Sequence, residues 1–172
     1  MSDSFHHIDL DTLSEKAAQR RKAHEQLLKK IPKNKAIKML PRLDEEAFNK
    51  IDCLACANCC KHYSPRFKMP DIKRVARRLK MKESDFILTY LKMDEDGDYV
   101  VKSSPCPFLG ADNYCSIYED RPRDCARYPY TSEDVLIKQV PLTLKNASAC
   151  PAVFYVLERL MEVFDGDKKV KP

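Results

Sequence analysis

The chain contains eight cysteines, and half of them stand in one short segment with the pattern C-x2-C-x2-C-C. These are Cys53, Cys56, Cys59 and Cys60. Cysteine thiolates ligate zinc, iron and iron–sulfur clusters, and this spacing lets a short loop turn several thiolates toward one centre. The remaining cysteines are Cys106, Cys115, Cys125 and Cys150. The sequence therefore predicts one or two metal centres, with all eight cysteines as candidate ligands.

The spacing favours an iron–sulfur cluster of the 4Fe-4S type over zinc or mononuclear iron. Bacterial ferredoxins combine C-x2-C-x2-C with a later Cys-Pro dipeptide, and both Cys106-Pro107 and Cys150-Pro151 supply that dipeptide. Zinc ribbons normally carry two C-x2-C knuckles, and no second knuckle follows Cys60. Zinc and mononuclear iron stay as alternatives, because a folded domain can gather distant thiolates.

The cysteines also bear on the compartment. The sequence has no apolar run of ~18 residues or more, and residues 1–10 have no apolar signal segment. We therefore expect a cytoplasmic protein with no membrane partner. In a reducing compartment, cysteines more often bind metal than form lasting disulfides.

The formal net charge of +5 overstates how basic the protein is. That value counts cysteines as neutral, whereas metal ligation requires thiolates. A zinc ion or a 4Fe-4S core with four thiolates carries −2, so two such sites would reduce +5 to about +1. The charge gives little support for a nucleic-acid partner, and a protein partner is expected instead.

The hydrophobic pattern predicts a mainly α protein with a loop-rich cysteine metal lobe and short β segments, which is a small α+β fold. Apolar residues at helical spacing predict helices over residues 9–30, 45–50, 72–79, 84–91 and 148–164. Pro41 is expected to keep the connector to Asp44 irregular, and Ser84 to cap the fourth helix.

Extended structure is expected in two places. A short strand is predicted over residues 99–102, after a turn at residues 94–98 that contains Gly97. Residues 135–144 are predicted to form strands interrupted by Pro141. At 172 residues the chain has the length of one main domain, which we divide into an N-terminal helical extension (1–43), a cysteine-cluster metal-binding domain (44–165) and a flexible tail (166–172).

An ordered set of motifs resembles a known family. After the C-x2-C-x2-C-C segment come Cys-Pro-Phe-Leu at 106–109, Cys-Ser-Ile-Tyr at 115–118, Arg121-Pro122, Cys125, Tyr128-Pro129 and Cys150-Pro151. This set resembles the CxxCxxCC, or YkgJ-like, family of zinc- or iron-chelating domains. Two departures are visible: Ala57 stands where the family often has Gly, and Ala126 where it often has Arg, with Arg127 one position later.

Few other residues carry a chemical signal. Arg121 and Arg127 flank Cys125 and could offset the negative charge of a thiolate-ligated cofactor. His62 is expected at the surface or beside the ligands, and His6, His7 and His24 are expected to be exposed. Catalytic residues are not identifiable, because the sequence has no phosphate-binding glycine loop, no H-E-x-x-H and no Ser-His-Asp order.

Two functions are compatible with these features. The first is an iron–sulfur (or zinc or iron) protein that transfers electrons or serves as an accessory module for a partner enzyme. The alternative is a structural zinc-binding protein that docks on a protein or nucleic acid. Metal identity separates the two, and whether the chain is itself an enzyme stays open.

Overall fold

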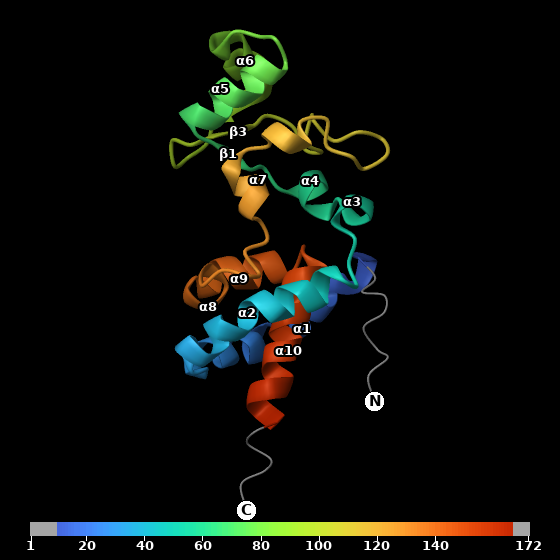
Figure 1. Ribbon diagram of the computed structural model, residues 1–172, viewed down its shortest axis with the longest axis vertical. Coiled ribbons are helices and arrows are strands. Elements are labelled where there is room, and N and C mark those ends of the chain that lie inside the picture. The colour runs from blue at the N-terminus through green and yellow to red at the C-terminus, as the bar shows by residue number, and fades with distance from the viewer. Residues whose placement is uncertain (1–9, 167–172) are drawn as a thin grey trace, which may run out of the picture. The chain divides into compact units, whose positions relative to one another are not determined.

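A computed structural model describes residues 10–166 and shows helices with one small sheet (Figure 1). The predicted small α+β class, mainly helical, is confirmed. The chain divides into two compact units, a helical unit (residues 1–53 and 129–172) and a cysteine unit (residues 54–128). His6, His7 and all of the predicted tail except Gly166 lie outside the described residues.

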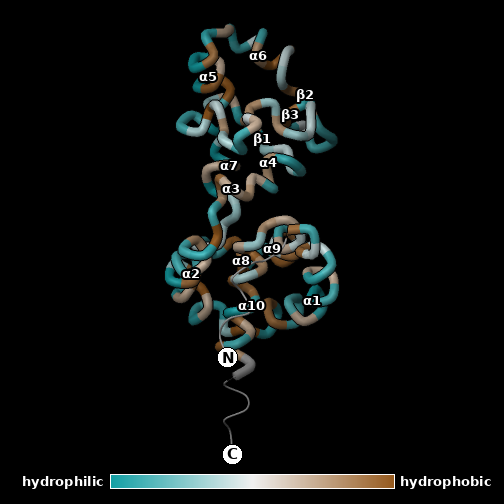
Figure 2. Tube along the Cα trace, turned by 90° about the vertical axis from the view of Figure 1, so that its right-hand side faces the viewer, coloured by the Kyte–Doolittle hydropathy of each residue, from teal (hydrophilic) through white to brown (hydrophobic). Residues whose placement is uncertain are grey.

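The helical unit is built around its last helix. Its helices are α1 (Leu10–Lys30), α2 (Lys33–Phe48), α8 (Val135–Lys138), α9 (Val140–Ala147) and α10 (Pro151–Gly166). Helix α10 packs against α1, α2 and α9 (Figure 1). Seven of its residues between Ala152 and Leu160 are buried, so its first half is covered on nearly all sides. Figure 2 accordingly shows the hydrophobic residues of this unit toward its middle.

Helix α1 confirms the predicted N-terminal helix, but its buried stripe includes a histidine. Leu13, Ala17, Leu27 and Leu28 lie on the buried face, and His24 is buried among them with 0% exposure. The expectation that His24 is exposed was wrong. His24 occupies a position of the same helical stripe, and Glu158 of α10 provides its Nε2 with a partner at 2.5 Å.

Helix α2 runs through Pro41, so the predicted irregular connector was wrong. A proline inside a helix costs about 3 kcal/mol or more, because it lacks an N–H donor and its ring crowds the preceding turn. Ala36, Leu40, Leu43 and Ala47 form a fully buried stripe along this helix, each at 0% exposure. Burial of that stripe outweighs the local cost of the proline.

The predicted strands over residues 135–144 are instead the short helices α8 and α9. Pro141 lies in the first turn of α9, where the missing N–H would have no helical partner in any case. The proline therefore begins a helix rather than interrupting a strand. Thr143 Oγ1 donates to the Leu136 carbonyl oxygen at 2.7 Å and ties the two helices together.

The cysteine unit combines short helices with a three-stranded antiparallel sheet. Its elements are α3 (Cys53–Cys56, which begins on the last residue of the helical unit), α4 (Asn58–His62), β1 (Arg66–Phe67), α5 (Met69–Arg78), α6 (Glu83–Tyr90), β2 (Leu91–Met93), β3 (Tyr99–Val101), the 3-10 turn η1 (Tyr118–Asp120) and α7 (Arg123–Arg127). The strand order is β1-β3-β2, and β2 and β3 form a hairpin through the predicted turn. Gly97 adopts a φ of +79° in that turn.

An apolar cluster fills the cysteine unit beside the sheet. Phe86 lies at its centre and contacts the rings of Phe67 and Phe108. Helices α5 and α6 confirm two predicted amphipathic helices, although α6 begins at Glu83 after Lys82 and not at a Ser84 cap. Cys106 and Cys115 pack against this cluster, so apolar residues cover one side of both thiols.

No helix within residues 10–166 combines the length and the apolar character needed to cross a bilayer.

Candidate metal centre

Four of the predicted ligands converge in the cysteine unit. The backbone N–H of Cys106 donates to the carbonyl oxygen of Cys60 at 2.8 Å, which joins the C-x2-C-x2-C-C segment to the first Cys-Pro dipeptide. Cys115 faces the turn after Cys106 through a β-bridge to Leu109. Cys125 lies close enough to these three thiols for each of them to raise its pKa. We call Cys60, Cys106, Cys115 and Cys125 the thiol cluster.

Backbone N–H groups point at two sulfurs of the thiol cluster. The sulfur of Cys106 accepts hydrogen bonds from the N–H groups of Phe108 and Leu109, and that of Cys115 accepts one from Ile117. Donors of this kind stabilise thiolates, and hydrogen bonds to sulfur tune the potential of an iron–sulfur cluster. The turns after both cysteines are thus suited to charged sulfur ligands.

The thiols themselves are held mostly in the neutral form. Burial raises the pKa of Cys106 to about 11 despite its two N–H donors. Burial also raises the pKa of Cys115 and Cys125, and the charges of neighbouring thiolates raise both further. Cys60 differs, because a hydrogen bond from Cys59 lowers its pKa to about 7. A cation among these sulfurs would relieve the mutual repulsion of the thiolates.

Among residues 10–166, no three Cys, His, Asp or Glu side chains are arranged as ligands around one point. The four cysteines of the thiol cluster therefore lie near one another, but their sulfur atoms are not arranged around a single metal position. The chemistry of the site nevertheless fits a zinc ion or an iron–sulfur cluster. Its donors are soft sulfur atoms, backbone N–H groups point at two of them, and apolar residues pack beside them.

The two predicted arginines lie in different surroundings. Arg121 is half-buried, its guanidinium lies 3.9 Å from the ring centre of Tyr118, and its positive charge lowers the pKa of Cys115. Arg127 is exposed at the end of α7, two residues after Cys125. The charge of Arg121 thus acts on one thiol of the cluster.

The other four predicted ligands are spread over both units. Cys56 and Cys59 are half-buried in the cysteine unit, whereas Cys53 and Cys150 belong to the helical unit. Cys53 is exposed and Cys150 is buried directly before α10. Residues 10–166 include all eight cysteines, and none of them forms a disulfide. His62 is exposed at the end of α4.

Ala57 adopts a backbone conformation that favours glycine. It joins α3 to α4 with a φ of +46° and a ψ of 16°, in the left-handed region that favours glycine. Its methyl group is nevertheless buried, with 4% exposure. The turn places Cys59 and Cys60 on the helix that follows.

Two residues of α5 that were not among the predicted site residues fix the segment before Cys125. Asp71 and Arg74 of α5 are bound to each other at 2.7 Å. Asp71 Oδ1 accepts a hydrogen bond from the Arg123 N–H, and Arg74 Nη2 donates to the Arg121 carbonyl oxygen. The i,i+3 spacing of an acid just before a predicted helix and a base within it was the signal available, but it gave no indication of their long-range partners.

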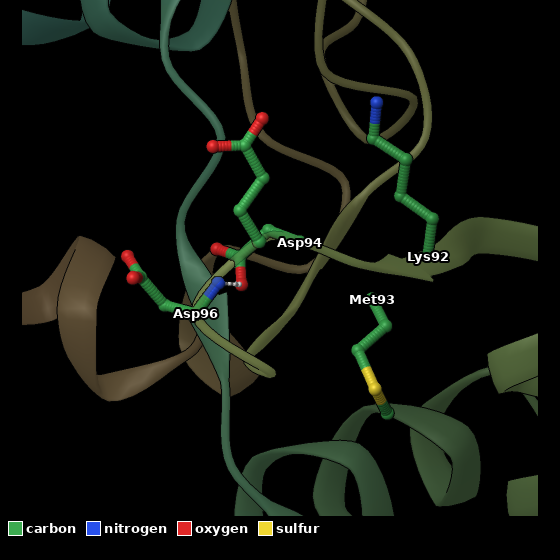
Figure 3. Close-up of a pocket in the computed structure, with 5 residues that line it drawn as sticks. Lys92, Met93, Asp94 and Asp96 are labelled. Carbon is green, nitrogen blue, oxygen red and sulfur yellow. Dashed lines mark hydrogen bonds between the residues drawn. The ribbon is translucent and has the colours of Figure 1, made fainter.

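A surface hollow on the β2–β3 turn is separate from the thiol cluster. It is lined by Lys92, Met93, Asp94, Glu95 and Asp96, as shown in Figure 3. The Asp94 carboxylate accepts N–H hydrogen bonds from Asp96 at 3.1 Å and from Asp98 at 2.8 Å, so it serves the turn itself. The hollow has no cysteine or histidine and is not part of the candidate metal centre.

Residues 52–151 match the CxxCxxCC family, which is described as a "putative zinc- or iron-chelating domain". The chain belongs to this family. The match confirms the resemblance seen in the sequence and supports metal binding by this CxxCxxCC protein. It spans all eight cysteines, and so includes the thiol cluster. No curated protein and no solved structure matches the chain.

Proposed function

We propose that this protein carries an iron–sulfur cluster on its cysteines and acts in the cytoplasm as an electron-transfer or accessory module for a partner enzyme. Cys60, Cys106, Cys115 and Cys125 are the ligands of one centre. The observation that carries the proposal is the convergence of these cysteines from distant parts of the sequence: the Cys106 N–H bonds the Cys60 carbonyl oxygen at 2.8 Å, Cys115 pairs with Leu109 in the turn after Cys106, and the charges of all three thiolates raise the pKa of Cys125.

Three features support a cluster at this position. Backbone donors point at the sulfurs of Cys106 and Cys115, and such bonds set cluster potentials. The apolar residues around Phe108 and Ile117 limit solvent on one side, which also tunes a redox centre. Arg121 brings a positive charge toward sulfurs that carry a net negative charge when ligated.

Cys53, Cys56, Cys59 and Cys150 supply a second set of thiols. Cys59 already donates a hydrogen bond to Cys60, so it influences the first centre without needing to ligate it. We propose that each of these four thiols is a further metal ligand, and that Arg127 adds a positive charge that offsets the charge of thiolate ligands. The proposed partner is a protein.

Zinc is the alternative metal. The family description names zinc beside iron, and zinc needs four thiolates and no added sulfide. In that case the protein is a structural module that docks on a protein or nucleic acid. The two functions differ in redox activity, since zinc has none.

The test is purification of the full chain without oxygen, followed by analysis of metal, acid-labile sulfide and the visible absorption spectrum. The proposed function predicts a brown protein with iron and sulfide in comparable amounts, bleached by dithionite. A colourless protein with stoichiometric zinc overturns the cluster in favour of the structural alternative. If the purified protein contains no metal and binds none when metal is added, both functions are rejected.

A further inference from the structure

Helix α7, which carries Cys125, is too short to hold its own position. It has five residues, and isolated helices shorter than about 12 residues are marginal in water. No residue of α7 belongs to the apolar cluster of the cysteine unit. Contacts made to α7 and to the segment before it therefore help to place Cys125.

One pair of residues on α5 supplies three of the hydrogen bonds to this segment. Asp71 Oδ1 accepts from the Arg123 N–H at 3.2 Å, at the first residue of α7. Arg74 Nε donates to the Asp120 carbonyl oxygen at 3.2 Å, and its Nη2 donates to that of Arg121 at 2.8 Å. The pair thus binds three backbone groups just before Cys125.

Burial and a further hydrogen bond hold the Asp71 side chain in place. The Asp71 side chain is only 7% exposed, and its second oxygen accepts from the Lys68 N–H at 3.1 Å, which fixes the start of α5. Buried carboxylates keep such hydrogen bonds because losing a partner costs the full desolvation of the charge. The Asp124 side chain adds a contact on the other side, since it accepts from Arg66 Nε at 3.0 Å.

We infer that Asp71 and Arg74 are positioning residues that set the place of Cys125 in the thiol cluster, and so determine how completely the centre closes around its metal. This inference rests on the proposed function. The residues act through the backbone of residues 120–123 and do not ligate metal. Partners of this kind typically change metal affinity by about tenfold to a hundredfold.

The experiment titrates the full apo chain with cobalt(II), whose thiolate charge-transfer absorption increases with the number of bound thiolates. Asp71→Asn and Arg74→Ala are compared with the wild type and with Arg77→Ala, an exposed arginine on the same helix. We expect both variants to bind cobalt at least tenfold more weakly and to lose charge-transfer intensity equal to one thiolate. Arg77→Ala should behave as the wild type.

Arg74→Lys, which keeps the charge and one donor, should recover part of the lost intensity. If far-ultraviolet circular dichroism shows that Asp71→Asn does not fold, the comparison of Arg74→Ala with Arg74→Lys tests the inference instead. Wild-type affinity and spectrum in Arg74→Ala would overturn the inference and leave the proposed function intact. Weaker binding with an unchanged spectrum would also overturn it, because general destabilisation gives that result. A wild-type chain that binds no metal would remove the proposed function and the inference with it.

Discussion

The backbone N–H of Cys106 donates a 2.8 Å hydrogen bond to the carbonyl oxygen of Cys60. This contact joins two cysteine motifs that lie far apart in the sequence, and Cys106 starts the turn whose N–H groups face its own sulfur. It holds the motifs together through the backbone, whatever the protonation state of the thiols.

Metal binding should release protons. Burial raises the pKa of Cys106 to about 11 and also raises the pKa of Cys115 and Cys125, so these three thiols are protonated near pH 7. We expect about three protons to leave for each zinc bound, so that the apparent affinity rises by up to about a thousandfold per pH unit near neutrality. Calorimetry in buffers of different ionisation enthalpy counts the protons. An affinity independent of pH between 6 and 8 would contradict the burial of these thiols.

The same shifts predict how the metal-free chain responds to alkali. A thiol whose pKa is raised from 9.0 to about 11 on folding contributes stability that is fully present below pH 9 and is lost as the pH rises through 11. Urea denaturation of the apo protein should therefore show decreasing stability above pH 9. The metal-loaded protein should not show this decrease, because its sulfurs are already deprotonated.

Single serine substitutions should separate ligands from neighbours. Cys106→Ser and Cys125→Ser should each lower metal affinity by at least about a hundredfold, because a serine oxygen is a poor replacement for a soft thiolate. His62→Ala is the matched control, since His62 is a metal-capable side chain exposed on α4 next to Cys60. Competition with a chromophoric chelator measures the affinities. If His62→Ala lost metal affinity while Cys106→Ser and Cys125→Ser kept it, the metal centre would not be formed by these cysteines.

Glu158 should stabilise the helical unit in an acid-sensitive way. Burial would raise its pKa, but hydrogen bonds from His24 and Arg20 outweigh burial and lower the pKa below 4.5. Its contribution is therefore present above pH 4.5 and is lost as the pH falls through the lowered pKa. Glu158→Gln should cost about 1–3 kcal/mol at pH 7, measured by urea denaturation.

Glu162→Gln, on the exposed side of the same helix, should change stability by less than about 0.5 kcal/mol. At a pH below the lowered pKa, the stabilities of Glu158→Gln and the wild type should approach each other. If the stability difference between Glu158→Gln and the wild type stayed constant from pH 7 down to acid unfolding, the charge of Glu158 would not be the source of the stabilisation.

Ala57 should tolerate glycine better than a normal helical position does. Its φ of +46° costs an alanine roughly 1 kcal/mol, so Ala57→Gly should leave the stability unchanged or raise it by up to about 1 kcal/mol. Ala55→Gly, in α3, should instead lower stability by about 1 kcal/mol, because glycine is a poor helix former. Equal destabilisation by both changes, in thermal unfolding, would argue against the left-handed turn.

The parts of the fold that could be predicted were those with a strong local pattern. Helices α5 and α10 follow from regularly spaced apolar residues, and the turn before β3 follows from Gly97 between two acidic residues. The cysteine motifs likewise indicated a metal-binding family directly. In each case the chemistry of neighbouring residues decided the local structure.

The parts that could not be predicted depend on long-range packing. Pro41 is tolerated because α2 buries a complete apolar stripe, and His24 is buried because Glu158 lies opposite it. Membership of Cys60, Cys106, Cys115 and Cys125 in one cluster also depends on contacts between distant segments. Spacing alone did not select these four from eight cysteines.

Cys60, Cys106, Cys115 and Cys125 should together surround one metal centre. X-ray absorption spectroscopy of the metal-loaded wild type, at the edge of whichever metal it carries, counts the sulfur atoms bound to it. We expect about four sulfur atoms bound to the metal at roughly 2.3 Å, with an additional iron–iron distance if the centre is a cluster. A first shell of nitrogen and oxygen without sulfur would contradict this expectation.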